Sequence, residues 1–189
     1  MGVKPTIDKE TILETAWNMA AQEGLSRLSI RSLANACGVS VGSIYNYFPN
    51  KGELVAGIVD RFWYQAIAHD VMAFKEGESF VSFCERVTEA LSGAVSKFQA
   101  GWLGQIGYLD ETTRKIARTH EAATWAHVQK ALLTALENDK AIKPDALEGT
   151  TPEALCELVW GSIMATLRGQ HGTANAASTL FALLRKALY

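Results

Sequence analysis

The 189 residues carry a formal net charge of −2 and are 48% hydrophobic, a composition typical of a globular protein with a substantial core. This charge excludes a protein that holds nucleic acid through bulk positive charge alone. The three cysteines are widely spaced and form no CxxC or Cys/His pattern, so we expect buried thiols, without a disulfide framework or a metal site. No secretory signal and no membrane-spanning run is recognisable, and we therefore expect a cytoplasmic protein without a membrane anchor.

Helical periodicity dominates from the start of the chain, and it predicts an all-α fold. In a first helix at about 7–22, Ile12, Ala16 and Ala20 recur at helical spacing and form its inner face. The residues up to 52 contain five basic and four acidic side chains, whereas the remainder has 13 basic and 16 acidic ones. The N-terminal part therefore carries a slight positive charge, so any nucleic-acid contact depends on individually placed residues and helix N-termini.

Residues 28–54 have the sequence LSIRSLANACGVSVGSIYNYFPNKGEL and predict two short helices joined by a tight turn. Gly38 stands where the first of these helices ends, because glycine enters the left-handed backbone conformation without a Cβ clash. Ser40 follows at the predicted N-cap of the second short helix. Two helices joined by a glycine-containing turn of three or four residues form a helix-turn-helix, which places its second helix in the major groove of DNA.

The rest of the chain predicts long helices separated by polar or glycine-rich breaks. Asn50 is a predicted N-cap, and either Thr150 or Thr151, followed by Pro152, marks another helix start. The segment GWLGQIG at 101–107 matches no nucleotide-binding glycine motif and is interpreted as a corner. Besides the helix-turn-helix, we expect helices at about 7–22, 50–75, 79–100, 110–138, 152–169 and 173–188.

The segments ILETAWNMAAQEG, SIRSLANACGVS and IYNYFPNKGEL occur in this order near the start of the chain. Together they resemble the N-terminal domain of the TetR family of transcriptional regulators. The resemblance implies a three-helix DNA-binding domain at 1–52 and a larger helical domain for ligand binding and dimerisation at 53–189. It also implies a double-stranded DNA operator, a small-molecule effector and a second copy of the chain as partners.

The resemblance and the chemistry of the side chains together suggest the DNA contacts. Arg31 matches a DNA-contacting position of the family and can pair with guanine, and Val41 can pack on a thymine methyl group. Tyr45 and Tyr47 match phosphate-facing positions, while Ile44 and Phe48 are expected in the core. The complete predicted set is Ser29, Arg31, Ser40, Val41, Gly42, Ser43, Tyr45, Tyr47 and Lys51.

The C-terminal part holds aromatic and histidine side chains that could surround a ligand, although aromatic residues at helical spacing also serve as ordinary core. His120 and His127 lie seven residues apart on one predicted helix face, without a third metal ligand in evidence. The predicted pocket set is Phe98, Trp102, Tyr108, His120, Trp125, His127 and Trp160.

The last two helices are apolar on two faces, and a helix of this kind is buried on two sides. One side can pack in the chain's own core, and the other favours a partner subunit, which the family resemblance also implies. The alternative is a monomer with centrally packed helices. The predicted interface comprises Leu158, Gly161, Ala165, Gly169, Ala177, Leu180, Phe181 and Leu184.

These expectations indicate a ligand-responsive repressor that binds a palindromic operator as a homodimer. A transcriptional activator is an alternative, and so is a helical ligand-binding protein or enzyme that binds no operator. No catalytic constellation, cofactor motif or metal site is predicted, so we do not expect an enzyme.

Overall fold

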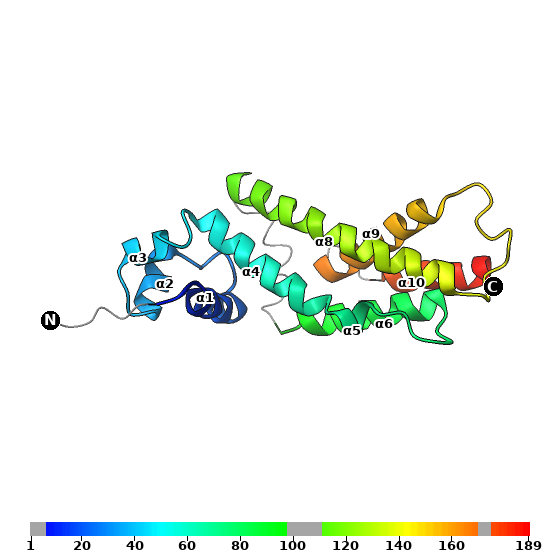
Figure 1. Ribbon diagram of the computed structural model, residues 1–189, viewed down its shortest axis with the longest axis horizontal. Coiled ribbons are helices and arrows are strands. Elements are labelled where there is room, and N and C mark those ends of the chain that lie inside the picture. The colour runs from blue at the N-terminus through cyan, green and yellow to red at the C-terminus, as the bar shows by residue number, and fades with distance from the viewer. Residues whose placement is uncertain (1–6, 98–110, 170–174) are drawn as a thin grey trace. The chain divides into compact units, whose positions relative to one another are not determined.

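The computed structural model describes residues 7–97, 111–169 and 175–189, without the side chains of 69, 112–114 and 116–123. All regular secondary structure in these ranges is helical, as predicted (Figure 1). No helix among them is long and apolar enough to cross a membrane. The helices are α1 (Lys9–Glu23), α2 (Ile30–Ala36), α3 (Val41–Tyr45), α4 (Lys51–Ala66), α5 (His69–Met72), α6 (Phe80–Val95), α8 (Glu111–Asn138), α9 (Pro152–Arg168) and α10 (Ala176–Leu188).

The helix starts follow the predicted caps. The Asn50 side chain accepts a hydrogen bond of 2.9 Å from the Glu53 amide, and the Thr151 hydroxyl accepts one of 3.2 Å from Ala154. The structure thereby selects Thr151 over Thr150 as the cap of α9. Each cap satisfies a backbone N–H that has no partner within its own helix.

One predicted helix is interrupted. A continuous helix was expected from about 50 to 75, but α4 ends at Ala66 and the four-residue α5 follows, after a non-helical backbone at Ala68 with ψ of 151°. The break leaves the carbonyls of Val71 and Ala73 outside a continuous helical ladder, and the Arg86 guanidinium donates hydrogen bonds of 2.8 Å to each. A contact from α6, distant in sequence, thus compensates the interruption.

The described chain forms two compact units, one of residues up to 63 with 96–121, the other of 64–95 with 122–189. Two boundaries fall within α4 and α8, and the third follows the end of α6. The predicted functional division at residue 52 stays a prediction. The core of the first unit is built from the inward faces of α1 to α4, and its fully buried side chains include Ile12, Ala16, Leu33, Ile44, Leu54 and Ile58.

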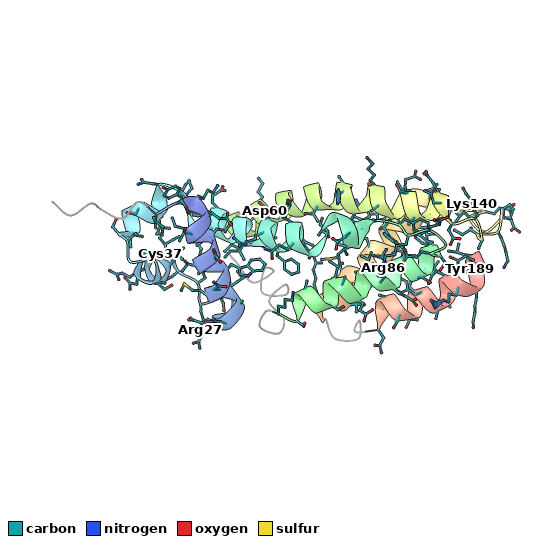
Figure 2. The ribbon with its side chains drawn as sticks, turned by 60° about the horizontal axis from the view of Figure 1, so that its bottom comes forward. Arg27, Cys37, Asp60, Arg86, Lys140 and Tyr189 are labelled. Atoms are coloured by element: carbon teal, nitrogen blue, oxygen red, sulfur yellow. The ribbon has the colours of Figure 1, made fainter. Side chains whose placement is uncertain are left out.

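In the second unit, α6, α9 and α10 pack against one another around buried Phe80, Phe83, Val159, Ile163 and Phe181. Arg86 on α6 (Figure 2) also forms a bidentate pair with Glu78, with N–O distances of 2.7 and 2.9 Å. This pair lowers the pKa of the Glu78 carboxyl, because the hydrogen bonds from Arg86 favour its charged form. The segment 71–78 is therefore fixed to α6 by four hydrogen bonds from Arg86.

Candidate nucleic-acid interface

Helix α2 begins with a reciprocal capping arrangement. The Ser29 hydroxyl accepts a hydrogen bond of 3.0 Å from the Ser32 amide, and the Ser32 hydroxyl accepts one of 3.2 Å from the Ser29 amide. This local bonding explains why a seven-residue helix forms here. It orients Arg31, one residue into the helix, with an exposed side chain.

The turn between α2 and α3 has the predicted left-handed glycine, with φ of +66° at Gly38. The amides of Gly38 and Val39 donate to the carbonyls of Asn35 and Ala34, at 3.1 and 3.0 Å, which closes the end of α2. Ser40 then caps α3 by accepting a hydrogen bond of 3.1 Å from the Ser43 amide. The two helices of the helix-turn-helix are therefore specified by local contacts.

Helix α3 has an inner and an outer face. Ile44 is fully buried, and Phe48, just beyond the helix, is 2% exposed, which confirms both as core residues. Val41 and Tyr45, on the other side of the helix, are 37% and 48% exposed. Gly42 is exposed between them. The outer face thus offers an apolar side chain, an open backbone and a phenol to a partner.

The hydroxyl groups of Ser40 and Ser43 are less available for DNA contacts than the sequence indicated. Their hydroxyl oxygens lie 2.9 Å apart, and Ser40 also accepts the capping hydrogen bond. One of the two hydroxyl protons is therefore engaged between them. A single donor remains to contact a base edge.

The two tyrosines also differ. Tyr47 is half-buried, and its hydroxyl donates a hydrogen bond of 2.8 Å to the Ile7 carbonyl, whereas no partner is described for the exposed Tyr45 hydroxyl. A phenol has one proton, so Tyr47 cannot donate to a phosphate while it holds Ile7. Lys51 is half-buried and occupies the first turn of α4, where Asn50 already caps the Glu53 amide.

Contacts between α1 and α4 support this surface, and the sequence did not reveal them. The Arg61 guanidinium pairs with Glu10 and lies 5.8 Å from the Trp17 ring centroid. A Cβ atom at Gly57 would approach Leu13 Cδ1 to 3.2 Å, so glycine permits close packing of the two helices. No local sequence signal indicates these pairs, because their members lie more than 40 residues apart.

Three of the predicted pocket residues, Trp125, His127 and Trp160, are described in the second unit. Trp125 and Trp160 stack with ring centroids 6.0 Å apart. His127 is exposed and borders a hollow beside α5. Phe98, Trp102, Tyr108 and the side chain of His120 lie outside the described residues.

The cysteines of this unit have the inert character that was expected. Burial raises the pKa of Cys84 well above its usual range and that of Cys156 to about 12, so both remain thiols at neutral pH. Within the described residues, no group of three or more His, Cys, Asp or Glu side chains could hold a metal ion.

The predicted dimer residues divide into two groups. Leu158, Gly161 and Gly169 are exposed, whereas Ala165 and Leu180 are half-buried. Ala177, Phe181 and Leu184 are at most 8% exposed, because they pack into the core of their own chain. The exposed face of α10 instead carries Leu183, which is 59% exposed.

The described part of the chain is helical and has an exposed, locally capped helix-turn-helix near its N-terminus. Residues 12–58, which contain this helix-turn-helix, match the family described as bacterial regulatory proteins, tetR family. The N-terminal part of the chain is thus similar to the DNA-binding part of that family.

A relative is similar in the N-terminal sequence, and solved structures are similar in fold. A transcriptional repressor of Streptomyces coeruleorubidus, DrrR1, is 42% identical over 60 residues, which are 32% of this chain and 22% of the repressor. The chain thus aligns with only about a fifth of this relative. The fold is similar to that of Salmonella enterica GusR, with a TM-score of 0.64, 18% identity and coverage of 97% and 98% of the two chains. BioQ, solved with its double-stranded DNA operator, gives a TM-score of 0.63 at 15% identity, with 96% and 98% covered.

Proposed function

We propose that this protein is a sequence-specific, DNA-binding transcriptional regulator that binds a palindromic operator as a homodimer. The observation that carries the proposal is the outer face of α3, where Val41, Gly42 and Tyr45 are exposed on a helix whose inner side is fully packed. A helix of this kind can enter the major groove with its N-terminal residues against base edges.

The residues of this surface are suited to two kinds of DNA contact, with bases and with phosphates. Arg31 is suited to a bidentate pair with guanine, Val41 to a thymine methyl group, and Gly42 to close approach of the backbone. Tyr45 and Lys51 are suited to phosphates, which position the domain without specifying sequence. Ser29, Ser40, Ser43 and Tyr47 have smaller roles, because their hydroxyl groups already take part in hydrogen bonds within the domain.

Dimerisation through α9 and α10 completes the proposal. Leu158 on α9 and Leu183 on α10 are 55% and 59% exposed, and the two helices pack against each other. Gly161 adds a position where a second helix can approach closely, since no atom lies within 4 Å of a Cβ built there. A symmetric dimer would present two recognition helices to half-sites about 34–36 Å apart.

We further infer that the regulator acts as a repressor that a small molecule releases from DNA. The similarity to the named repressor DrrR1 supports repression. A ligand that changes the spacing of the two recognition helices would disfavour DNA binding, with a typical coupling of about 1–3 kcal/mol.

Selection of bound duplexes from a random pool tests the proposal. The wild-type protein is expected to enrich a palindrome, and Arg31→Ala to lose preference at one base pair of each half-site. Arg27→Ala is the matched control, because Arg27 is exposed in the same unit but lies outside α2 and α3. Enrichment of no sequence by the folded wild-type protein would contradict the proposed function.

A further inference from the structure

A hollow of about 290 Å³ lies between the end of α5 and the second half of α8, within the second unit. Its volume is close to the lower end of the range for small-molecule sites. The described residues that line it are Met72, Ala73, Phe74, His127, Lys130, Ala131 and Thr134.

The floor of this hollow is apolar and firmly held. Met72 is 6% exposed, and Phe74 is half-buried with its ring 6.1 Å from that of Phe83, in an edge-to-face arrangement. The carbonyl of Ala73, between them, accepts a hydrogen bond from Arg86. A ligand would therefore meet a preformed apolar surface, which lowers the cost of ordering the site on binding.

The rim on α8 is basic. His127 and Lys130 are three residues apart, so they lie on the same helix face, and Thr134 follows one turn beyond Lys130. None of the described lining residues is acidic, and neither basic side chain forms an ion pair within the described part of the chain. The hollow thus combines an uncompensated cation, an imidazole and a hydroxyl with an apolar floor.

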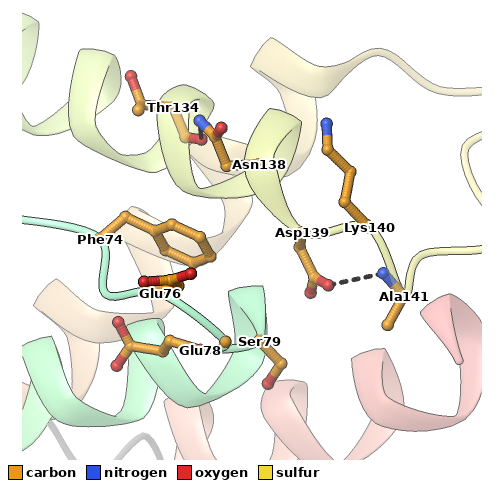
Figure 3. Close-up of a pocket in the computed structure, with 10 residues that line it drawn as sticks. Phe74, Glu76, Glu78, Ser79, Thr134, Asn138, Asp139, Lys140 and Ala141 are labelled. Atoms are coloured by element: carbon orange, nitrogen blue, oxygen red, sulfur yellow. Dashed lines mark hydrogen bonds between the residues drawn. The ribbon is translucent and has the colours of Figure 1, made fainter.

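A neighbouring hollow of about 710 Å³ has the opposite character. It shares Phe74 and Thr134 with the first hollow, and Figure 3 shows Glu76 and Glu78 beside Phe74. Asp139 also lines it. Glu78 is paired with Arg86 and Lys140 also lines this hollow, so Glu76 and Asp139 are the carboxylates that would repel an anion there. A negatively charged group would meet no lining carboxylate beside His127 and Lys130.

We propose that the hollow formed by Met72, Phe74, His127 and Lys130 binds a small hydrophobic carboxylate. The carboxylate would contact Lys130 and His127, while its apolar part covers Met72 and Phe74. The action of such a ligand as the effector rests on the proposed regulatory function. The binding itself depends only on the second unit.

Binding can be measured on the methyl groups of methionine. The chain has four methionines, Met1, Met19, Met72 and Met164. Protein labelled with ¹³C-methyl methionine is titrated with 3-phenylpropionate, and the Met72 resonance is assigned from the variant Met72→Leu. We expect a saturable shift of the Met72 signal, with the Met19 signal unchanged.

Charge controls sharpen the test. The neutral amide 3-phenylpropanamide has nearly the same shape and should bind about fivefold more weakly. The acid should also bind Lys130→Gln about fivefold more weakly, because an exposed ion pair contributes at most about this factor. Lys140→Gln is the matched control, since Lys140 borders only the acidic hollow, and it should not alter affinity. Equal affinity for acid and amide, or no shift at Met72 in the folded protein, would overturn the proposal.

A separate arm measures release of the selected DNA by 3-phenylpropionate. A shift of the Met72 resonance without DNA release would support the binding site and contradict only its regulatory role. A protein that selects no DNA but shows the charge-dependent Met72 shift would contradict the proposed function and support the site.

Discussion

The Asp139 carboxylate accepts a hydrogen bond of 2.6 Å from the hydroxyl of Tyr189, a residue 50 positions away in the sequence. The same oxygen accepts one of 2.7 Å from the amide of Phe80 at the start of α6, and the other oxygen accepts one of 3.0 Å from Ala141. Asp139 is only 8% exposed. One buried carboxylate therefore connects the end of α8, the start of α6 and the residue after α10.

Loss of this carboxylate should destabilise the fold. Asp139→Ala leaves a buried amide without its acceptor, and we expect it to reduce the free energy of unfolding by about 3 kcal/mol. Tyr189→Phe removes one hydrogen-bond donor to Asp139 and should reduce the free energy of unfolding by about 1.5 kcal/mol. Urea denaturation measures both, with the exposed Glu137→Ala as control, which should change stability by less than about 0.5 kcal/mol. An Asp139→Ala value as small as that of the control would contradict the role of Asp139.

The same carboxylate should make stability depend on acid pH. Burial raises the pKa of Asp139, but the hydrogen bonds from Tyr189, Phe80 and Ala141 outweigh burial and hold its pKa below the ordinary 3.8. The stabilisation is then complete above the unfolded-state pKa and is lost as pH falls through the folded-state value. The stability difference between wild type and Asp139→Asn should be constant near neutrality and shrink below about pH 4. A difference that stays constant down to pH 2 would be inconsistent with this assignment.

Tyr45 and Tyr47 should respond differently to loss of the hydroxyl group. Tyr47→Phe removes the hydrogen bond to Ile7 and should cost about 1 kcal/mol of stability. Tyr45→Phe should leave stability unchanged but weaken DNA binding more than Tyr47→Phe does, because only the Tyr45 hydroxyl proton is available to a phosphate. Thermal unfolding and fluorescence anisotropy with the selected duplex distinguish the two effects. A larger loss of DNA affinity for Tyr47→Phe would reverse the assignment.

Substitution of the two glycines of the helix-turn-helix should affect protein stability and DNA binding differently. Gly38→Ala should cost roughly 1–2 kcal/mol, because a Cβ is disfavoured at a φ of +66° even though no atom lies within 4 Å. Gly42→Ala should stabilise α3 by about 0.5–1 kcal/mol, since the nearest atom to a new Cβ is 3.8 Å away. It should nevertheless weaken DNA binding, because a methyl group would stand between the helix and the base edges. Unchanged affinity would place Gly42 outside the interface.

Replacement of Arg31 should weaken DNA binding in a way that depends on the DNA sequence, whereas replacement of Lys51 should weaken binding to every duplex. Lys51→Ala should weaken binding to all duplexes and reduce the salt slope of log K by about 1 per half-site. Arg31→Ala should cost roughly 1–3 kcal/mol on the selected site and relax preference at one base pair. Anisotropy titrations at several salt concentrations measure both. An unchanged slope removes Lys51 from the contacts, and equal losses on selected and random DNA make Arg31 a phosphate contact.

The interrupted helix shows where prediction from sequence failed. Periodicity continued past Ala66, but α6 supplies the Arg86 contacts that compensate a break there. The apolar residues Phe181 and Leu184 on the last helix are buried within the chain, where α10 packs against α6 and α9, and their place in a subunit interface stays a prediction. A helical pattern marks a face as apolar, but it does not encode which neighbour covers that face.

The sequence by itself determined the all-α class, the helix-turn-helix and the caps at Ser40 and Asn50. These features depend on contacts within three or four residues, so local chemistry specifies them. Only the tertiary structure decided the break after Ala66, the joining of three chain segments at Asp139 and the engagement of the Tyr47 hydroxyl. Each of these depends on a side chain that folding brings from a distant part of the chain to a backbone group, and no spacing in the sequence records that approach.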